Sequence, residues 1–289
     1  MKLWLLLLPG LGSIVFLMGS ALYTIMIQSV GLHTELGASL DYWSDTLSDP
    51  ILFRSIEYSL RTSVLGSLGA VILAYPIAMW LRKPIPGKTA IIGLLRAPMF
   101  VPGLVAAFLL INVISFHGIL NESLLALGVI DKPLRITNDK FGWSVVMLQV
   151  WKNTPFALIL LSSSINSIRS DVLDASADLG ASAWANFSQV VFPLTIPALQ
   201  AALILIFIGA LGDFAFASIA GSRNVYSLSV LMHYTATAYY EWEKAAVIGL
   251  VIMVLSGLSA ILITLMTRPF ANRTRPVISA SFLERSHEK

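Results

Sequence analysis

Residues 171–197, DVLDASADLGASAWANFSQVVFPLTIP, interrupt a sequence that is otherwise typical of membrane spans. The stretch carries Asp171, Asp174 and Asp178 close together, which makes it too polar to cross a bilayer. It also lacks the density of Gly, Pro and Ser that marks a disordered linker. We therefore expect a folded helical hairpin at a membrane surface, where it is available to a partner protein.

The first half of this stretch predicts a short helix that ends in a glycine turn. Ser170 or Asp171 is expected to cap its N-terminus, where the negative charge of aspartate also interacts favourably with the helix dipole. Gly180 is placed to end the helix in a left-handed conformation, which glycine adopts without steric cost.

The second half predicts another helix, with Ser182 as its cap. Apolar residues recur there every three or four positions and so share one face. These residues are Trp184, Phe187, Val190 and Val191. Pro193 and Pro197 are expected to end the helix, because proline removes a backbone donor and its ring clashes with the preceding turn.

The composition surrounding the hairpin is that of an integral membrane protein. Of 289 residues, 56% are hydrophobic and 12% are charged, with a mean hydropathy of +0.79, whereas globular domains carry roughly 25% charged residues. The chain has no cysteine, which excludes disulfides and cysteine-based zinc sites. Its net charge of +3 is spread beside the apolar runs, which argues against nucleic acid as a partner.

Six apolar runs are long enough to approach or exceed the roughly 20 residues that cross a ~30 Å hydrocarbon core. They are residues 3–30, 62–81, 97–114, 141–168, 199–219 and 245–267. We expect an all-α membrane protein with six spans and the hairpin, residues 169–197, between spans four and five. Residues 1–270 then form one transmembrane domain, and residues 271–289 form a short tail. Polar stretches 31–58 and 116–140 are expected outside the membrane.

The distribution of basic residues predicts the orientation. With the N-terminus in the cytoplasm, ten Lys and Arg residues lie on the inner side and six on the outer side. This arrangement places both termini and the hairpin in the cytoplasm, where an ATPase could reach the hairpin.

The hairpin resembles the cytoplasmic signature of the permease subunits of bacterial ATP-binding-cassette importers. That signature is E-A-A, three residues, G, nine residues, I, one residue and L-P. Asp174, Ala175 and Ser176 stand at E-A-A, and Gly180 stands at the glycine. The later positions are held by Val190 and by Phe192 with Pro193. The spacing matches throughout, with Asp for Glu, Ser for the second Ala, Val for Ile and Phe for Leu as departures.

The resemblance implies that the hairpin forms coupling helices that sit in a groove of an ATPase subunit. The implied coupling residues are Asp174, Ala175, Ser176, Asp178, Gly180, Ala181, Phe187 and Pro193. It further implies two ATP-binding subunits, a second permease subunit of similar or identical sequence, and an external substrate-binding protein. ATP and Mg²⁺ then belong to the partner ATPase, and the location is the bacterial inner membrane.

Patterns that suggest enzymatic chemistry are incomplete. Gly87, Lys88 and Thr89 end like a phosphate-binding loop, but Arg82 stands where its first glycine is required. The four histidines are scattered, without the spacing of metal ligands. We therefore expect no catalytic residue, metal site or cofactor in this chain.

Two ionisable residues lie deep within the expected spans, Lys152 in span four and Asp213 in span five. A charge at the centre of a lipid-exposed helix costs on the order of 2.5–3.5 kcal/mol, so such residues are expected to face an aqueous path or a partner. Aromatic neighbours could line the same path. The candidate path residues are Trp151, Lys152, Asp213, Phe214 and Phe216. An ion pair between Lys152 and Asp213 is the alternative.

The cargo is the least determined property. Residues 120–136 are similar to the permeases of the spermidine/putrescine group, and Leu211 to Phe214 recur in the wider group of iron, phosphonate and thiamine systems. A polyamine suits a path of aromatic faces and few carboxylates. Iron, phosphonate, sulfate and thiamine remain alternatives. A gradient-driven secondary transporter is the competing class, although the sequence shows no internal repeat of the kind that such transporters carry.

Overall fold

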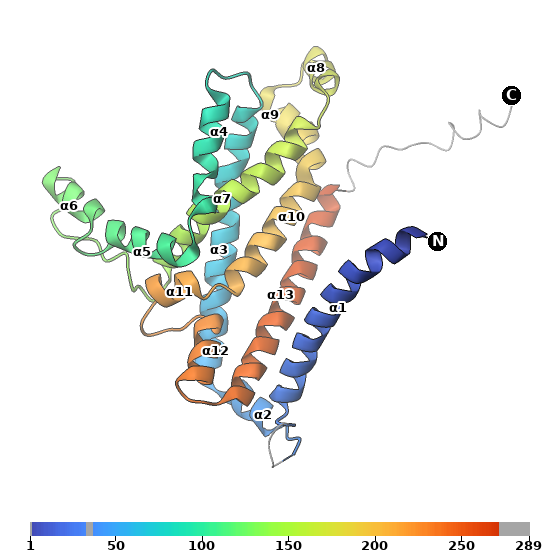
Figure 1. Ribbon diagram of the computed structural model, residues 1–289. Coiled ribbons are helices and arrows are strands. Elements are labelled where there is room, and N and C mark those ends of the chain that lie inside the picture. The colour runs from blue at the N-terminus through green and yellow to red at the C-terminus, as the bar shows by residue number, and fades with distance from the viewer. Residues whose placement is uncertain (1, 33–36, 272–289) are drawn as a thin grey trace. The chain divides into compact units, whose positions relative to one another are not determined.

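The structure is a computed structural model that describes residues 2–32 and 37–271 (Figure 1). Within these residues, the regular elements are all helices. Six helical segments are long and apolar enough to cross a membrane, which confirms the all-α, six-span prediction. They are Pro9–Ser29, Pro50–Leu81, Gly103–Ala126, Trp143–Asn166, Ala183–Leu211 and Trp242–Phe270. The expected tail, apart from Ala271, lies outside the described residues.

The chain divides into two compact units. The first consists of Met1–Thr62, Ala107–Val145 and Leu211–Gly257. Its helices are α1 (Lys2–Ser29), α2 (Asp41–Ser48), α6 (Ile119–Ala126), α11 (Ala215–Ala220) and α12 (Leu228–Thr237). A buried core of Leu52, Leu228, Leu231 and Ile248 holds it together. The buried Ser59 hydroxyl accepts a bond of 2.8 Å from the Leu228 amide and so joins α12 to the rest of this unit.

The second unit consists of Ser63–Ala106, Val146–Ala210 and Leu258–Lys289. Its short elements are α4 (Lys88–Arg96), η1 (Ala97–Phe100), α8 (Ser170–Asp178), α9 (Ala183–Asn186) and η2 (Phe187–Val191), followed by the long α10 (Phe192–Leu211). Figure 1 shows α4, α8 and α9 at the same end of the long helices of this unit. Four further helices contribute residues to both units: α3 (Pro50–Leu81), α5 (Gly103–Ile114), α7 (Trp143–Asn166) and α13 (Trp242–Ala271), and the last residue of α10, Leu211, is assigned to the first unit.

Within the second unit, glycines bring α3 close to α7. A Cβ atom added at Gly66 would lie 2.7 Å from Cβ of Gln149, and one added at Gly69 would lie 2.5 Å from Cγ2 of Val150. Neither distance is sterically possible without movement. Small residues at these positions therefore allow the backbones to approach, as is common where membrane helices pack.

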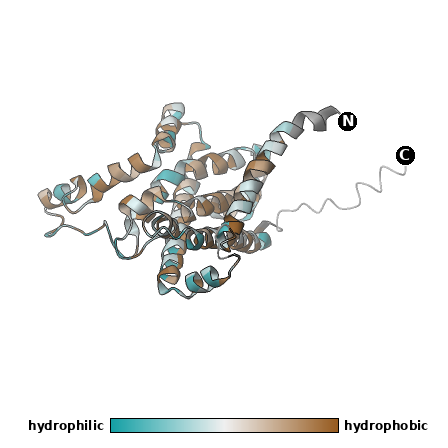
Figure 2. Ribbon diagram, turned by 60° about the horizontal axis from the view of Figure 1, so that its bottom comes forward, coloured by the Kyte–Doolittle hydropathy of each residue, from teal (hydrophilic) through white to brown (hydrophobic). Residues whose placement is uncertain are grey.

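The long helices leave many apolar side chains uncovered. Figure 2 shows hydrophobic residues along the long helices. On α1, Val15, Phe16 and Met18 are 66–72% exposed. Such surfaces suit lipid tails, and a helix satisfies its own backbone groups in lipid.

Three predicted spans differ from the observed helices by more than four residues at one end or both. Span two begins at Pro50 instead of residue 62, because Pro50 is tolerated in a first helical turn and Asp49 Oδ1 accepts a bond of 2.8 Å from the Ile51 amide. Span five is interrupted after Leu211, so Asp213 lies between α10 and α11 rather than inside one helix. Span three starts at Gly103, after a break at Val101 and Pro102. The stretch 116–140, predicted as a loop, contains α6.

The prediction that Pro193 and Pro197 end the second hairpin helix is wrong. The helix continues from Ala183 through the π-helical turn η2 into α10, with Pro197 inside α10. The amide of Phe192 donates to the carbonyl of Phe187, five residues earlier. This wider turn moves the carbonyls away from the ring of Pro193, which relieves the clash that proline causes in a regular α-helix.

Candidate coupling surface and transport path

The first hairpin helix is α8, and its N-terminus is held by an ion pair rather than by a cap. The N-cap position is Arg169, without a side-chain cap bond, so the prediction that Ser170 or Asp171 caps the helix is wrong. Asp171 instead accepts a bond of 2.6 Å from Nη2 of Arg169. The carboxylate still lies in the first turn, where it is favourable to the helix dipole.

The turn between the two hairpin helices confirms the expected glycine geometry. Gly180 has φ +80°, and the Gly180 amide donates to the carbonyl of Ala177. The Ala181 amide donates to the carbonyl of Ser176, which completes the usual bonding of a helix end with a left-handed residue. Ser182 then caps α9 as predicted, because its hydroxyl accepts a bond of 3.2 Å from the Ala185 amide.

The tip of the hairpin presents apolar side chains to its surroundings. Leu179 is 89% exposed and Trp184 is 73% exposed. The predicted coupling residues Asp174, Ala175, Asp178 and Gly180 are exposed as well, while Ser176, Ala181 and Phe187 are half-buried and Pro193 is buried. Large apolar groups beside small and acidic ones form a surface that a protein partner could cover.

Phe187, unlike the exposed residues of the tip, packs against other aromatic rings. Its ring lies edge-on to Tyr75 of α3 at 5.5 Å and packs near Phe192 at 6.0 Å. The Tyr75 hydroxyl also hydrogen-bonds the buried Thr195 hydroxyl of α10. These contacts anchor the base of the hairpin to α3, so Phe187 fixes its position within this unit.

Arg82, which the sequence pattern singles out only as the residue that breaks a phosphate-binding motif, is a second anchor. Its guanidinium donates to the carbonyl of Ile165 at 2.9 Å and to that of Ile168 at 2.8 Å. Both acceptors lie at or just beyond the end of α7, where helix carbonyls lack intrahelical partners. Arg82 therefore holds the chain directly before the hairpin. No local pattern marks this role, because its partners are backbone atoms more than 80 residues away.

A hollow of about 510 Å³ lies beside the second hairpin helix. Its walls are mainly aromatic and apolar. The lining residues are Trp184, Phe187, Ser188, Gln189, Phe192, Pro193 and Phe270. The predicted coupling residues Phe187 and Pro193 thus border this hollow.

Two of the predicted path residues, Trp151 and Lys152, lie on α7 in the second unit. Trp151 is 41% exposed. The ammonium group of Lys152 donates to the carbonyl oxygens of Pro98 at 2.6 Å, Met99 at 3.1 Å and Val101. The lysine charge is therefore satisfied by backbone oxygens at the break before α5.

The other three path residues lie in the first unit, at the break between α10 and α11. Asp213 Oδ1 accepts bonds from the amides of Ala215 at 2.8 Å and Phe216 at 3.3 Å, the first two residues of α11, although the N-cap position itself is Phe214. The Asp213 carbonyl accepts a bond of 2.8 Å from the Ser229 hydroxyl. Phe214 is 38% exposed, whereas Phe216 is buried.

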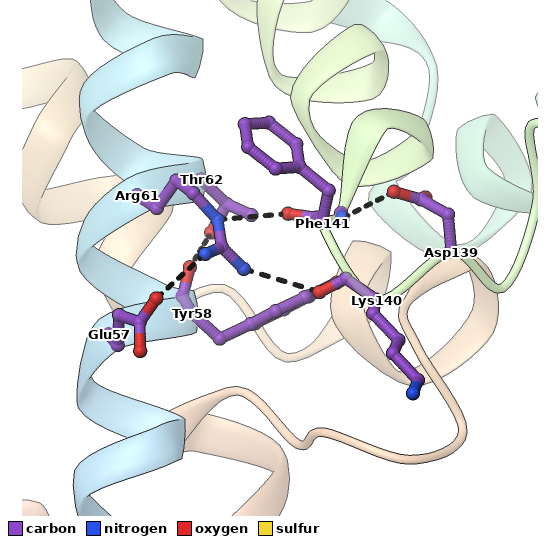
Figure 3. A network of polar contacts seen from close by, with 8 residues as sticks. Glu57, Tyr58, Arg61, Thr62, Asp139, Lys140 and Phe141 are labelled. Atoms are coloured by element: carbon purple, nitrogen blue, oxygen red, sulfur yellow. Dashed lines mark hydrogen bonds and ion pairs between the residues drawn. The ribbon is translucent and has the colours of Figure 1, made fainter.

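Arg61 organises a polar network in the first unit (Figure 3). It donates to Glu57 at 2.9 Å and to the carbonyls of Lys140 and Phe141, each at 3.2 Å. The guanidinium lies 4.6 Å from the centre of the Phe141 ring. The spacing of Glu57 and Arg61 by four residues was a visible signal of the ion pair. The carbonyl bonds, which join α3 to the start of α7, were not visible in the sequence.

Comparisons with known proteins bear on this arrangement. A family described as "Binding-protein-dependent transport system inner membrane component" matches residues 66–275. The spermidine/putrescine transport system permease protein PotB of Escherichia coli K12 is 31% identical over 214 residues, covering 73% of this chain and 77% of that protein. A probable sulfate transport system permease protein cysT of Chlorokybus atmophyticus is 25% identical over 222 residues, covering 75% and 74%.

Solved structures share the fold at lower sequence identity. A bacterial ABC transporter that imports the acidic polysaccharide alginate aligns with a TM-score of 0.78 at 16% identity, covering 93% of this chain and 95% of that one. The same transporter in complex with an alginate pentasaccharide-bound periplasmic protein aligns with a TM-score of 0.77 at 17% identity and the same coverage.

Proposed function

This chain belongs to the family of binding-protein-dependent transport system inner membrane components, the permeases of ABC importers, and we propose that its α8–α9 hairpin couples the transport path to ATP hydrolysis on a separate subunit. The observation that carries the proposal is the exposed apolar tip at Leu179 and Trp184. A tip of this kind, on a hairpin whose base is anchored, can transmit force in both directions.

The chemistry of the tip suits docking into a groove. Burying a Leu side chain contributes about 1.5–3 kcal/mol, and aromatic anchors commonly dominate interface energies. Ala175 and Ala181 leave room for close approach by the partner backbone. The anchors at Tyr75 and Arg82 connect the hairpin to α3 and α7, so movement of the tip would be passed to membrane helices.

The partners of the complex are proposed on the same basis. They comprise two ATP-binding subunits, a second permease subunit and an external substrate-binding protein. In this proposal ATP and Mg²⁺ bind to the ATP-binding subunits, and transport needs no catalytic residue, metal or cofactor from this chain. Both termini and the hairpin lie on the cytoplasmic side of a bacterial inner membrane.

The proposed cargo is a polyamine. The similarity to the spermidine/putrescine permease supports it, and so do Trp151 and Phe214, whose partly exposed rings can attract a cation by roughly 0.5–2 kcal/mol. Asp213 supplies one carboxylate close to Phe214. The similarity to a sulfate permease keeps sulfate as an alternative, alongside iron, phosphonate and thiamine.

Purification of the tagged chain in detergent, followed by mass spectrometry of the intact complex, tests the proposal. We expect ATP-binding subunits in the complex and substrate-dependent ATP hydrolysis. Leu179→Asp should release the ATP-binding subunits. Leu127→Asp serves as the matched control, because Leu127 is a similarly exposed leucine, at 75%, at the end of α6. Equal retention of the ATP-binding subunits by both variants would reject the hairpin as the docking site.

A further inference from the structure

The backbone break before α5 forms a cup of three carbonyl oxygens around one ammonium group. Pro98, Met99 and Val101 supply the oxygens, and Lys152 supplies the ammonium. Val101 has an extended conformation and Pro102 has no N–H, so the helical hydrogen-bond ladder is interrupted there. The carbonyl groups at this break lack some of the backbone N–H donors that a continuous helix would supply, and the ammonium group of Lys152 donates to them instead.

The cup lies at membrane depth. Lys152 is the tenth of the 24 residues of α7, which places it about 14 Å from one end of this span and about 21 Å from the other at 1.5 Å per residue. Non-helical backbone at such depth is tolerated where it is buried in protein or lines a cavity. In secondary transporters, unwound backbone carbonyls near the midplane coordinate the coupling Na⁺ or H⁺, which shows that such carbonyls can bind a cation.

The donor and acceptor numbers of the cup match a primary ammonium. An R–NH₃⁺ group has three N–H donors and no acceptor, and the cup offers three acceptors. Among the described residues, Lys152 makes no ion pair with a carboxylate. Its binding therefore depends on carbonyl dipoles, which bind a cation less tightly than a carboxylate would and so allow its release.

The cup is also open to approach in this chain. Phe100 is 83% exposed, Met99 is 39% exposed and Trp151 is 41% exposed. The aromatic faces can attract a second cation beside the one already bound. Lys152 itself is only half-buried, so its side chain has room to leave the cup.

We propose that the carbonyls of Pro98, Met99 and Val101 form a binding site for a primary ammonium group, which Lys152 fills at rest and from which a terminal ammonium of the cargo displaces it. The side chain of Lys152 is an alkylammonium, so it has the same chemistry as one end of a polyamine. This inference rests on the proposed polyamine cargo. It adds that the chain carries its own competitor for the cargo.

Chemical rescue tests the ammonium site without any transport. In the Lys152→Ala complex, n-propylammonium supplies the atoms that the substitution removes, and its three N–H groups can fill the cup. We expect a saturable rise in unfolding temperature of about 3 °C or more with n-propylammonium. Tetramethylammonium, a cation without N–H donors, should give no rise, and the wild-type complex should respond to neither. Equal responses to both cations, or no response, would overturn the proposal.

Lys152→Met provides a second variant that keeps most of the side-chain volume. Both variants are prepared with and without n-propylammonium throughout expression and purification, and rescue of folding by the amine also supports the site. If neither variant folds even with the amine present, the cup does not accept a free ammonium and the proposal fails.

Putrescine tests the link to cargo. It should raise the unfolding temperature of Lys152→Ala, and the variant should need less putrescine than wild type for half-maximal ATPase stimulation, because the competitor is gone. Rescue by n-propylammonium with no effect of putrescine would reject displacement by cargo. The small molecule found in the native binding protein independently tests the polyamine proposal, so the two can fail separately.

Discussion

Arg82 Nη1 lies 2.9 Å from the carbonyl oxygen of Ile165, so the residue that follows α3 holds the end of α7. The second guanidinium nitrogen reaches Ile168, directly before the hairpin begins. This fork of donors makes the position of α8 depend on α3. A lysine cannot reproduce the fork, because its ammonium is a point donor.

We expect Arg82→Lys to weaken coupling and Arg82→Gln to weaken it further. Hydrogen bonds to a charged group contribute about 1.5–3 kcal/mol each, and part of this is lost in either variant. The unfolding temperature and the ratio of cargo transported to ATP hydrolysed are the measurements. Lys83→Gln, at the exposed neighbouring position, is the control. Arg82→Gln with wild-type coupling would show that this anchor is dispensable.

Gly180→Val should disturb the hairpin turn through backbone strain alone. A Cβ atom at Gly180 would meet nothing within 4 Å, but φ of +80° costs a residue with a side chain about 1–2 kcal/mol. We expect reduced recovery of ATP-binding subunits, with partial restoration in Gly180→Asn because asparagine tolerates this conformation. Gly93→Ala, at an equally uncrowded helical glycine, should be neutral or slightly stabilising. Equal recovery of ATP-binding subunits by Gly180→Val and Gly180→Asn would contradict this account of the turn.

Arg61 makes both an exposed ion pair and hydrogen bonds to backbone carbonyls, and two substitutions distinguish their contributions to stability. Glu57 is 74% exposed, so Glu57→Gln should change stability by no more than about 0.5 kcal/mol. Arg61→Met also removes the bonds to Lys140 and Phe141, and a loss of about 2 kcal/mol is expected. Unfolding temperatures of the solubilised variants give the comparison. A larger effect from Glu57→Gln than from Arg61→Met would show that the ion pair dominates.

Asp213→Asn removes the negative charge at the break after α10 and keeps a side-chain oxygen for the hydrogen bonds there. The asparagine oxygen can still accept from the amides of Ala215 and Phe216, so assembly should be unchanged. Removal of the negative charge should reduce polyamine-stimulated ATPase activity of the reconstituted complex. Asp213→Ala, which also loses both bonds to these amides, should lower stability as well. Normal stimulation in Asp213→Asn would remove this carboxylate from the proposed path.

The hairpin shows which features are readable from sequence. Gly180 and Ser182 act within a few residues of their own position, and the structure confirms both. Pro193 does not end the helix, because a π-helical turn accommodates it, and no pattern in the sequence distinguishes such a turn from a regular helical one.

The charged residues within the spans show the complementary limit. Lys152 and Asp213 stood out because isolated charges are costly in a membrane. Their observed partners are backbone carbonyls and amides, which every residue possesses and no sequence pattern distinguishes. The two charges are therefore visible in the sequence, whereas the helix breaks that they stabilise are not.

The most direct test uses the absence of cysteine from this chain. Leu179→Cys and Leu127→Cys each introduce a single thiol at an exposed leucine, in the hairpin and at the end of α6 respectively. The measurement is thiol-specific cross-linking in the intact complex, with the product identified by mass spectrometry. We predict that Leu179→Cys cross-links to an ATP-binding subunit and that Leu127→Cys does not. A cross-link to the ATP-binding subunit from Leu127→Cys, with none from Leu179→Cys, would contradict the assignment of the hairpin as the coupling surface.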